Sequence, residues 1–99
     1  MKITLEKIKV GDSFLIEGGG NDHGPGKQIA LVRKVSRQGN VYCAKFSQKN
    51  KCVIAKKHKL ELDKIVGRYP FMSWVWNHCN SSQQDRIVNF LEQNNIERY

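Results

Sequence analysis

At 99 residues the chain is long enough for one domain with a modest hydrophobic core. Its 17 lysines and arginines outnumber 9 acidic residues, which gives a net charge of +8, and no segment approaches the roughly 18 apolar residues of a membrane span. The 3 cysteines are an odd number, which favours reduced thiols over a disulfide framework. We therefore expect a cytoplasmic protein with no membrane contact.

The first two thirds of the chain have the pattern of short antiparallel strands joined by turns. Gly11-Asp12 precedes an apolar run, as in a turn that leads into a strand, and residues 17–27 form a glycine-rich loop. Residues 36–40 are a tight connection, so the strands on either side of them form a hairpin. Strands are predicted over residues 13–16, 28–35, 41–47 and 52–56, and residues 60–66 form a short last strand or one turn of helix.

The pattern then changes from strand to helix. Pro70 suits the first turn of a helix, and a helix is predicted over about 82–94 because apolar residues recur there at helical spacing. Ser81 and Gln84 resemble a capping box before that helix. We predict an α+β fold in a single domain, residues 1–99. A small, strongly bent antiparallel sheet of four to five strands, an SH3-like open barrel, forms a basic part (1–68), and a C-terminal helical part (69–99) follows.

Positive charge is concentrated in the predicted sheet. No acidic residue lies between Asp22 and Glu61, and residues 1–68 hold 15 basic and 6 acidic residues, whereas residues 69–99 are nearly neutral. Charge gathered on folded structure attracts polyanions through counterion release. The sequence therefore predicts binding to phosphates of RNA or DNA, with solubility alone or a protein partner as alternatives. The predicted contacts are Lys27, Arg33, Lys34, Arg37, Lys45, Lys49, Lys51, Lys56, Lys57 and Lys59.

Residues 8–47 carry a resemblance to known small barrels. The order Ile-Lys-Val-Gly-Asp, strand, loop, strand, glycine turn, strand is similar to the open barrels of the KOW and Tudor kind and, more faintly, to MazF/PemK toxin barrels. The toxin resemblance implies an endoribonuclease. Two toxin features differ here: Gly26-Lys27-Gln28 replaces the Arg-Pro that opens the second strand, and no proline precedes Ser47.

Sites for chemistry are sparse in the sequence. The loop could form an anion nest with Lys27, but the phosphate-binding spacing that ends in Gly-Lys-Ser/Thr fails. No acid–base pair is evident beside His58. We therefore expect no enzymatic activity, no cofactor and no metal, with a MazF-like endoribonuclease as the alternative. Zinc sites usually contain closely spaced pairs of ligands, and here the one close pair is His78 and Cys79, which are adjacent in sequence. The candidate zinc ligands are Cys43, Cys52, His58, His78 and Cys79.

Aromatic side chains suggest two further surfaces. Tyr42 and Phe46 share one face of their strand and form either part of the core or a platform for base stacking. The segment 71–79 is either a core lid or the surface of a homodimer or protein partner. In the second case the protein is a small regulator or inhibitor, phage-encoded for example, that docks on a larger protein or nucleoprotein. The partner residues predicted are Phe71, Met72, Trp74 and Trp76.

Overall fold

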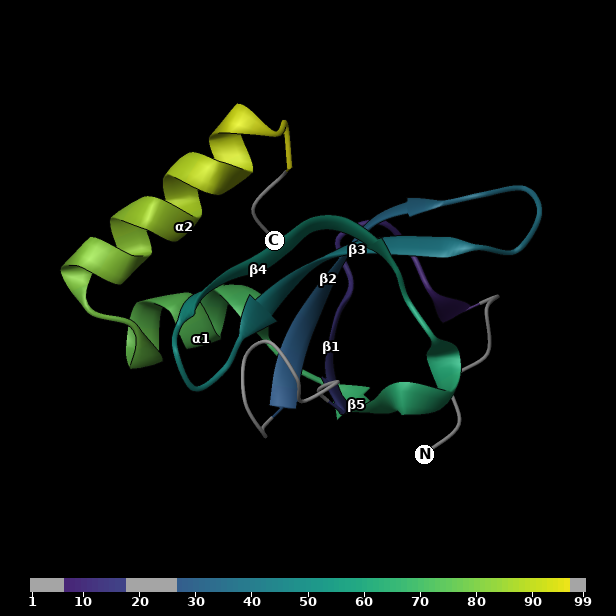
Figure 1. Cartoon of the computed structure of the whole chain (residues 1–99), viewed down its shortest axis with the longest axis horizontal. Helices are drawn as coiled ribbons and strands as arrows, with labels where there is room; N and C mark the ends of the chain where they lie inside the picture. The colour runs from purple at the N-terminus through teal and green to yellow at the C-terminus, as the bar shows by residue number, and fades with distance from the viewer. Residues whose placement is uncertain (1–6, 18–26, 97–99) are drawn as a thin grey trace.

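The computed structural model describes residues 7–17 and 27–96 and contains a five-stranded antiparallel sheet followed by two helices (Figure 1). The strand order is β4-β3-β2-β1-β5, so β4 and β5 are the edges of a sheet that is not closed. The predicted α+β fold is confirmed. The elements are β1 (Ser13–Glu17), β2 (Lys27–Val35), β3 (Val41–Ser47), β4 (Cys52–Lys59), the 3-10 turn η2 (Leu62–Lys64), β5 (Ile65–Arg68), α1 (Phe71–His78) and α2 (Ser81–Gln93).

One face of the sheet is covered by the two helices. Ile29, Leu31, Ala44 and Phe46 from β2 and β3 pack against apolar side chains of α1 and α2. Phe46 is fully buried, and its ring lies 4.7–6.3 Å from three helix aromatics, between ring centroids. Of the two alternatives for Phe46, part of the core or a platform for base stacking, the structure shows the first. The residues that the helices and the connection between them contribute to this cluster are Phe71, Trp74, Val75, Cys79, Ile87 and Leu91.

The other face of the same strands is buried as well. The alternate residues of β1, β2 and β3 point to this face, because side chains alternate along a strand. They pack with Ile8 before β1, Leu60 after β4 and Ile65 at the start of β5. These strands therefore need apolar residues on both faces, which explains the uninterrupted run Ile29–Val32. The strand residues of this second cluster are Phe14, Ile16, Ala30, Val32, Val41 and Cys43.

Both helices begin with hydrogen bonds that the sequence indicates only in part. Asn80, not Ser81, is the N-cap of α2: its side chain accepts from Gln83 N–H, and the Gln83 side chain accepts from Asn80 N–H. The capping box thus lies one residue before its predicted position. Pro70 precedes α1 and offers no side-chain cap, so the Ser13 hydroxyl on β1 accepts from the Phe71 N–H instead, at 3.2 Å.

Arg33 joins the sheet to the end of α2. It is the extra residue of a bulge in β2, where Val32 and Lys34 pair with consecutive residues of β3. One guanidinium nitrogen donates to the Lys56 carbonyl at 2.9 Å and the other to the Asn94 carbonyl at 3.0 Å. Since the last turn of α2 holds no basic residue, Arg33 supplies the positive charge that favours a helix C-terminus.

The two tryptophans should differ sharply in their effect on stability. Trp74 is 2% exposed within the helix-side core, whereas Trp76 is 51% exposed. We expect Trp74→Ala to lower the free energy of unfolding by about 3–5 kcal/mol and Trp76→Ala by no more than about 1 kcal/mol. Denaturant titration followed by circular dichroism measures both values. Equal losses of stability for the two variants would contradict this assignment of the core.

The bridging role of Arg33 can be tested at constant charge. Arg33→Lys keeps the charge but cannot reach both carbonyls with a planar fork, so we expect a decrease of about 1–2 kcal/mol in unfolding free energy. Amide hydrogen exchange should also accelerate in the last turn of α2. The matched control is Arg37→Lys in the exposed β2–β3 turn, where the change should stay within about 0.5 kcal/mol. If the two variants are equally stable, Arg33 does not hold the helix end.

Candidate nucleic-acid interface

Three adjacent strands place two lysines on either side of an aromatic ring. Tyr42 on β3 pairs with Lys34 on β2 and with Lys59 on β4, so the three residues form one row across the sheet. Residues paired in this way project their side chains on the same face. This row lies on the helix-covered face of β3, because Tyr42 alternates with Val41 and Cys43, which belong to the opposite cluster.

A third lysine reaches the row from β4. The Lys57 ammonium lies 5.3 Å from the centroid of the Tyr42 ring, in a cation–π contact. Register shifts in the β3–β4 ladder interrupt strict alternation along β4, and such bulges change where side chains point. We call Lys34, Tyr42, Lys57 and Lys59 the tyrosine–lysine cluster.

The cluster lies on a part of the sheet face that the helices leave open. Tyr42 and Lys34 belong to neither hydrophobic cluster, although Ala44 and Phe46 farther along β3 are covered by α1 and α2. Figure 1 shows the β2–β3 turn extending away from the helices. That turn carries Arg37, which is exposed and adds a fourth positive charge at this end of the sheet.

The lysines of the cluster form no ion pair within the described residues. The ion pairs found there are Glu61–Lys64 at 3.1 Å and Asp12–Arg68 at 3.4 Å, and neither includes a predicted phosphate contact. All three lysines of the cluster are exposed. Like charges held this close raise the local positive potential, which is what attracts an anion.

The remaining predicted contacts are distributed elsewhere. Arg33 is engaged by two backbone carbonyls, and Lys56 contributes one of those carbonyls while its side chain is exposed. Lys49 and Lys51 lie in the β3–β4 turn, at the opposite end of β3 from Tyr42. Lys27 pairs with Glu17 across β1 and β2. The structure thus gathers three of the ten predicted residues around Tyr42, with Arg37 nearby.

Lys45 belongs to the other side of the sheet. It is half-buried and pairs with Ala30, a member of the second hydrophobic cluster. The pKa of the Glu61 carboxyl is lowered, mainly by the hydrogen bond and charge of Lys64 and to a lesser degree by Lys45 and His58. The charge of Lys45 therefore acts on an acid, unlike the charges of the tyrosine–lysine cluster.

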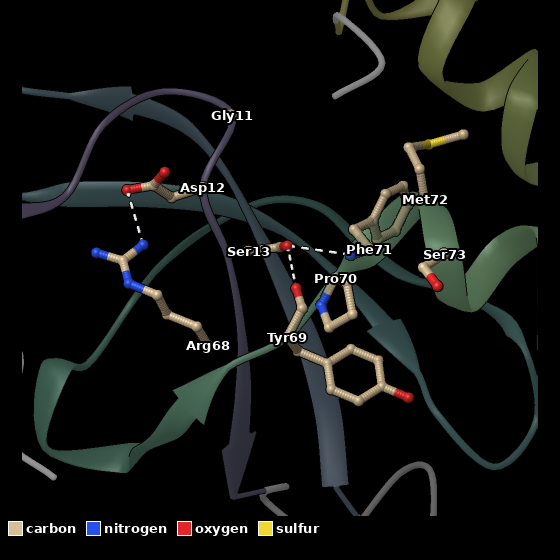
Figure 2. Close-up of a pocket in the computed structure, with 9 residues that line it drawn as sticks. All are labelled: Gly11, Asp12, Ser13, Arg68, Tyr69, Pro70, Phe71, Met72 and Ser73. Atoms are coloured by element: carbon tan, nitrogen blue, oxygen red, sulfur yellow. Dashed lines mark hydrogen bonds and ion pairs between the residues drawn. The ribbon is translucent and has the colours of Figure 1, made fainter.

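A shallow pocket of about 460 Å³ lies between the start of β1 and the start of α1 (Figure 2). Its polar groups are already engaged in the fold. The Ser13 hydroxyl donates to the Tyr69 carbonyl and accepts from Phe71 N–H, while Arg68 pairs with Asp12, donates to the Lys7 carbonyl and covers the Phe14 ring. The pocket could hold an apolar side chain, but its lining residues include no free acid–base pair. Its apolar lining comes from Tyr69, Pro70, Phe71 and Met72.

The predicted partner segment divides between core and surface. Phe71 and Trp74 are buried, so they offer almost no area to a partner, and the core-lid alternative describes them. Met72 is half-buried and lines the pocket, and Trp76, four residues later on α1, is largely exposed. A partner surface at residues 71–79 stays a prediction that rests on Met72 and Trp76.

The structure also locates the candidate groups for chemistry. Burial raises the pKa of the Cys43 thiol to about 11 and also raises that of Cys79, so neither is an activated nucleophile. Cys52 is exposed and lies opposite Ser47 instead of Cys43. The His58 ring nitrogen Nδ1 lies 3.0 Å from the Lys59 carbonyl. Residues 7–17 and 27–96 contain no cluster of three or more His, Cys, Asp or Glu side chains that could hold a metal.

Two features lie outside these findings or escape sequence reasoning. The glycine-rich loop considered as an anion nest falls within residues 18–26, outside the described residues, apart from Lys27. The structural roles of Arg33 and Ser13 have no signal in the sequence, because a bulge and a capping bond from a distant strand leave no local pattern.

Among the described helices, none has the length and apolar character needed to cross a membrane.

Comparison with known proteins gave no match: no family model, no curated protein and no solved structure matches this chain. The resemblance to KOW, Tudor and MazF/PemK barrels therefore stays a prediction from residues 8–47.

Proposed function

We propose that the protein binds nucleic acid through backbone phosphates, with the tyrosine–lysine cluster as the principal contact. The observation that carries the proposal is the gathering of Lys34, Lys57 and Lys59 around one aromatic ring, with no acidic partner among the described residues. Phosphate contacts by lysine supply most of the affinity for nucleic acid and require no deep cavity. A basic part of the sheet face that the two described helices leave open fits that requirement.

Lysines that served only solubility would have no reason to gather. Like charges gathered on one face of a sheet repel one another, and dispersing them would reduce that cost. Here two lysines flank Tyr42 in one row and a third lies above the ring. A bound phosphate chain would offset the repulsion.

The three cysteines are free, which fits a reducing compartment, and we place the protein in the cytoplasm as part of this proposal.

We also propose that the protein binds without catalysing a reaction. A ribonuclease needs a base and an acid that both reach the scissile phosphate. His58 contacts a backbone carbonyl through one ring nitrogen. Its charge also acts on Glu61, but that carboxylate is held in an ion pair by Lys64. The carboxylate on which His58 acts is therefore already paired.

A second candidate function has one observation in its favour. Trp76 is half-exposed on α1, on the same helix face as Met72, which lines the pocket. Exposed tryptophan is enriched among residues that dominate protein interfaces. The protein could therefore act as a small regulator that docks through α1, and this function is compatible with nucleic-acid binding at the other end of the sheet.

Two triple variants separate the effect of where the lysines lie on nucleic-acid affinity from the effect of net charge. The triple variant Lys34→Gln, Lys57→Gln, Lys59→Gln should weaken binding to an oligonucleotide and make the log–log salt dependence shallower by roughly 0.7–0.9 for each phosphate that no longer meets a lysine. The matched control is Lys27→Gln, Lys49→Gln, Lys51→Gln, which removes the same formal charge at the other end of the sheet. Fluorescence anisotropy over a series of salt concentrations measures both slopes.

We expect the control to retain most of the affinity and slope. Equal decreases in the two triple variants would mean that binding depends on net charge alone. Unchanged binding in the cluster variant would place the interface elsewhere. Circular dichroism at each salt concentration checks that both variants are folded, as expected because five of the six lysines are exposed and Lys51 is half-buried in a turn.

Absence of catalysis gives a separate prediction. Single-stranded RNA incubated with the protein should remain intact, because the carboxylate that His58 influences is already held by Lys64. The assay is denaturing gel electrophoresis of an end-labelled strand. Cleavage that disappears in His58→Ala while binding persists would favour the endoribonuclease alternative over our proposal.

A further inference from the structure

Tyr42 occupies a position that the fold does not require to be aromatic. Its neighbours Val41 and Cys43 are buried in the second cluster, but Tyr42 is half-buried and belongs to neither cluster. Within the described residues no hydrogen bond of its hydroxyl is found, and the contact of its ring is the one with Lys57. A large ring is therefore maintained outside both hydrophobic clusters and without a hydrogen bond in the described structure.

The contact that the ring does make is weak and replaceable. The Lys57 ammonium lies 5.3 Å from the ring centroid, and Lys57 is exposed, so water competes for its charge. Cation–π contacts at exposed sites are worth little, whereas stacking of a base on an aromatic side chain is substantially stronger. A base can therefore displace the lysine head from the ring, and the displaced ammonium remains close enough to meet a phosphate.

We propose that Tyr42 is a stacking platform for one unpaired base, and that the ligand of the tyrosine–lysine cluster is single-stranded nucleic acid. This inference rests on the proposed function and narrows it. Lys34 and Lys59 lie on the strands on either side of β3, with backbones about 10 Å apart since neighbouring strands are separated by about 4.8 Å. They can hold the phosphates on the two sides of the stacked base. A base inside a duplex is already stacked on its neighbours and must first be extruded.

The test compares three ligands of equal length: a single-stranded oligothymidylate, the corresponding strand of abasic sites, and a duplex. For Tyr42→Leu we expect affinity for the oligothymidylate to fall about 5- to 150-fold, which corresponds to about 1–3 kcal/mol at 1.4 kcal/mol per tenfold. Tyr42→Phe keeps the ring and should stay within about 2-fold. The salt slope of Tyr42→Leu should equal that of the parent, because no phosphate contact is removed.

The ligands give a control that requires no variant. The parent protein should bind the abasic strand about 5- to 150-fold more weakly than the oligothymidylate, a comparison of two ligands with one protein. Where Tyr42→Leu folds, it should bind the duplex with the parent's affinity. This arm keeps the inference testable if Tyr42→Leu does not fold. A single-stranded RNA of the same length shows whether the platform is shared by both nucleic acids, and we expect the same decrease in Tyr42→Leu.

The failures of the two proposals are distinguishable. If the parent binds abasic strand, duplex and oligothymidylate equally, Tyr42 does not stack a base, but the phosphate interface stands. If Tyr42→Leu and Tyr42→Phe lose affinity alike, the hydroxyl and not the ring is the contact, and the stacking inference is wrong. If the parent binds none of these ligands at low salt, the proposed function itself is wrong.

Discussion

Burial on both faces of β2 and β3 is the constraint on which the rest of the structure depends. Ile29 and Leu31 face the helices, while Ala30 and Val32 face the second cluster, so a covering layer is needed on each side. The helices supply one layer, and the segments around β1 and β5 supply the other. Because two short helices cover only part of their face, the sheet continues beyond them, and Tyr42 lies on that continuation. The candidate interface thus lies where the sheet extends beyond the two helices that pack on this face.

Arg33 sets the boundary between the covered and the uncovered part of that face. Its guanidinium is bound by a carbonyl of β4 and by a carbonyl at the end of α2, so its charge is used inside the structure. The next residue, Lys34, is exposed and forms no ion pair in the described structure, so its charge is open to a ligand. Two adjacent basic residues therefore have different surroundings. Val32 faces the second cluster, so alternation along β2 already places Arg33 on the helix side, and the bulge places Lys34 on that side as well, opposite Tyr42.

The sequence was sufficient for the elements and insufficient for the geometry of the site. Apolar spacing and turn residues predicted four strands and a helix whose bounds, Ser81–Gln93, differ from the prediction by one residue at each end. β4 extends to Lys59, three residues beyond its predicted end, because β3 continues as a pairing partner as far as Tyr42. Residues 60–66 contain both predicted alternatives, a helical turn and the start of a strand. Register shifts leave no pattern in the sequence, so the row of Lys34, Tyr42 and Lys59 could not be predicted, and ten basic residues appeared equivalent.

The tyrosine–lysine cluster departs from the rules that stabilise a sheet, and this departure is an argument for function. A row with a lysine on each of the two strands beside β3, a third lysine above the ring and no acid paired with them in the described structure is electrostatically unfavourable in the free protein. The half-buried ring adds no packing to either cluster. Elsewhere the same chain pairs its charges, as in Asp12–Arg68 and Glu61–Lys64, and satisfies its buried polar side chains within the described residues. Proteins usually violate local rules of stability at functional sites. The proposed ligand, a polyanion with an exposed base, would supply an anion for the lysines and a stacking partner for the ring, whereas the cation–π contact with Lys57 accounts for the position of that lysine alone.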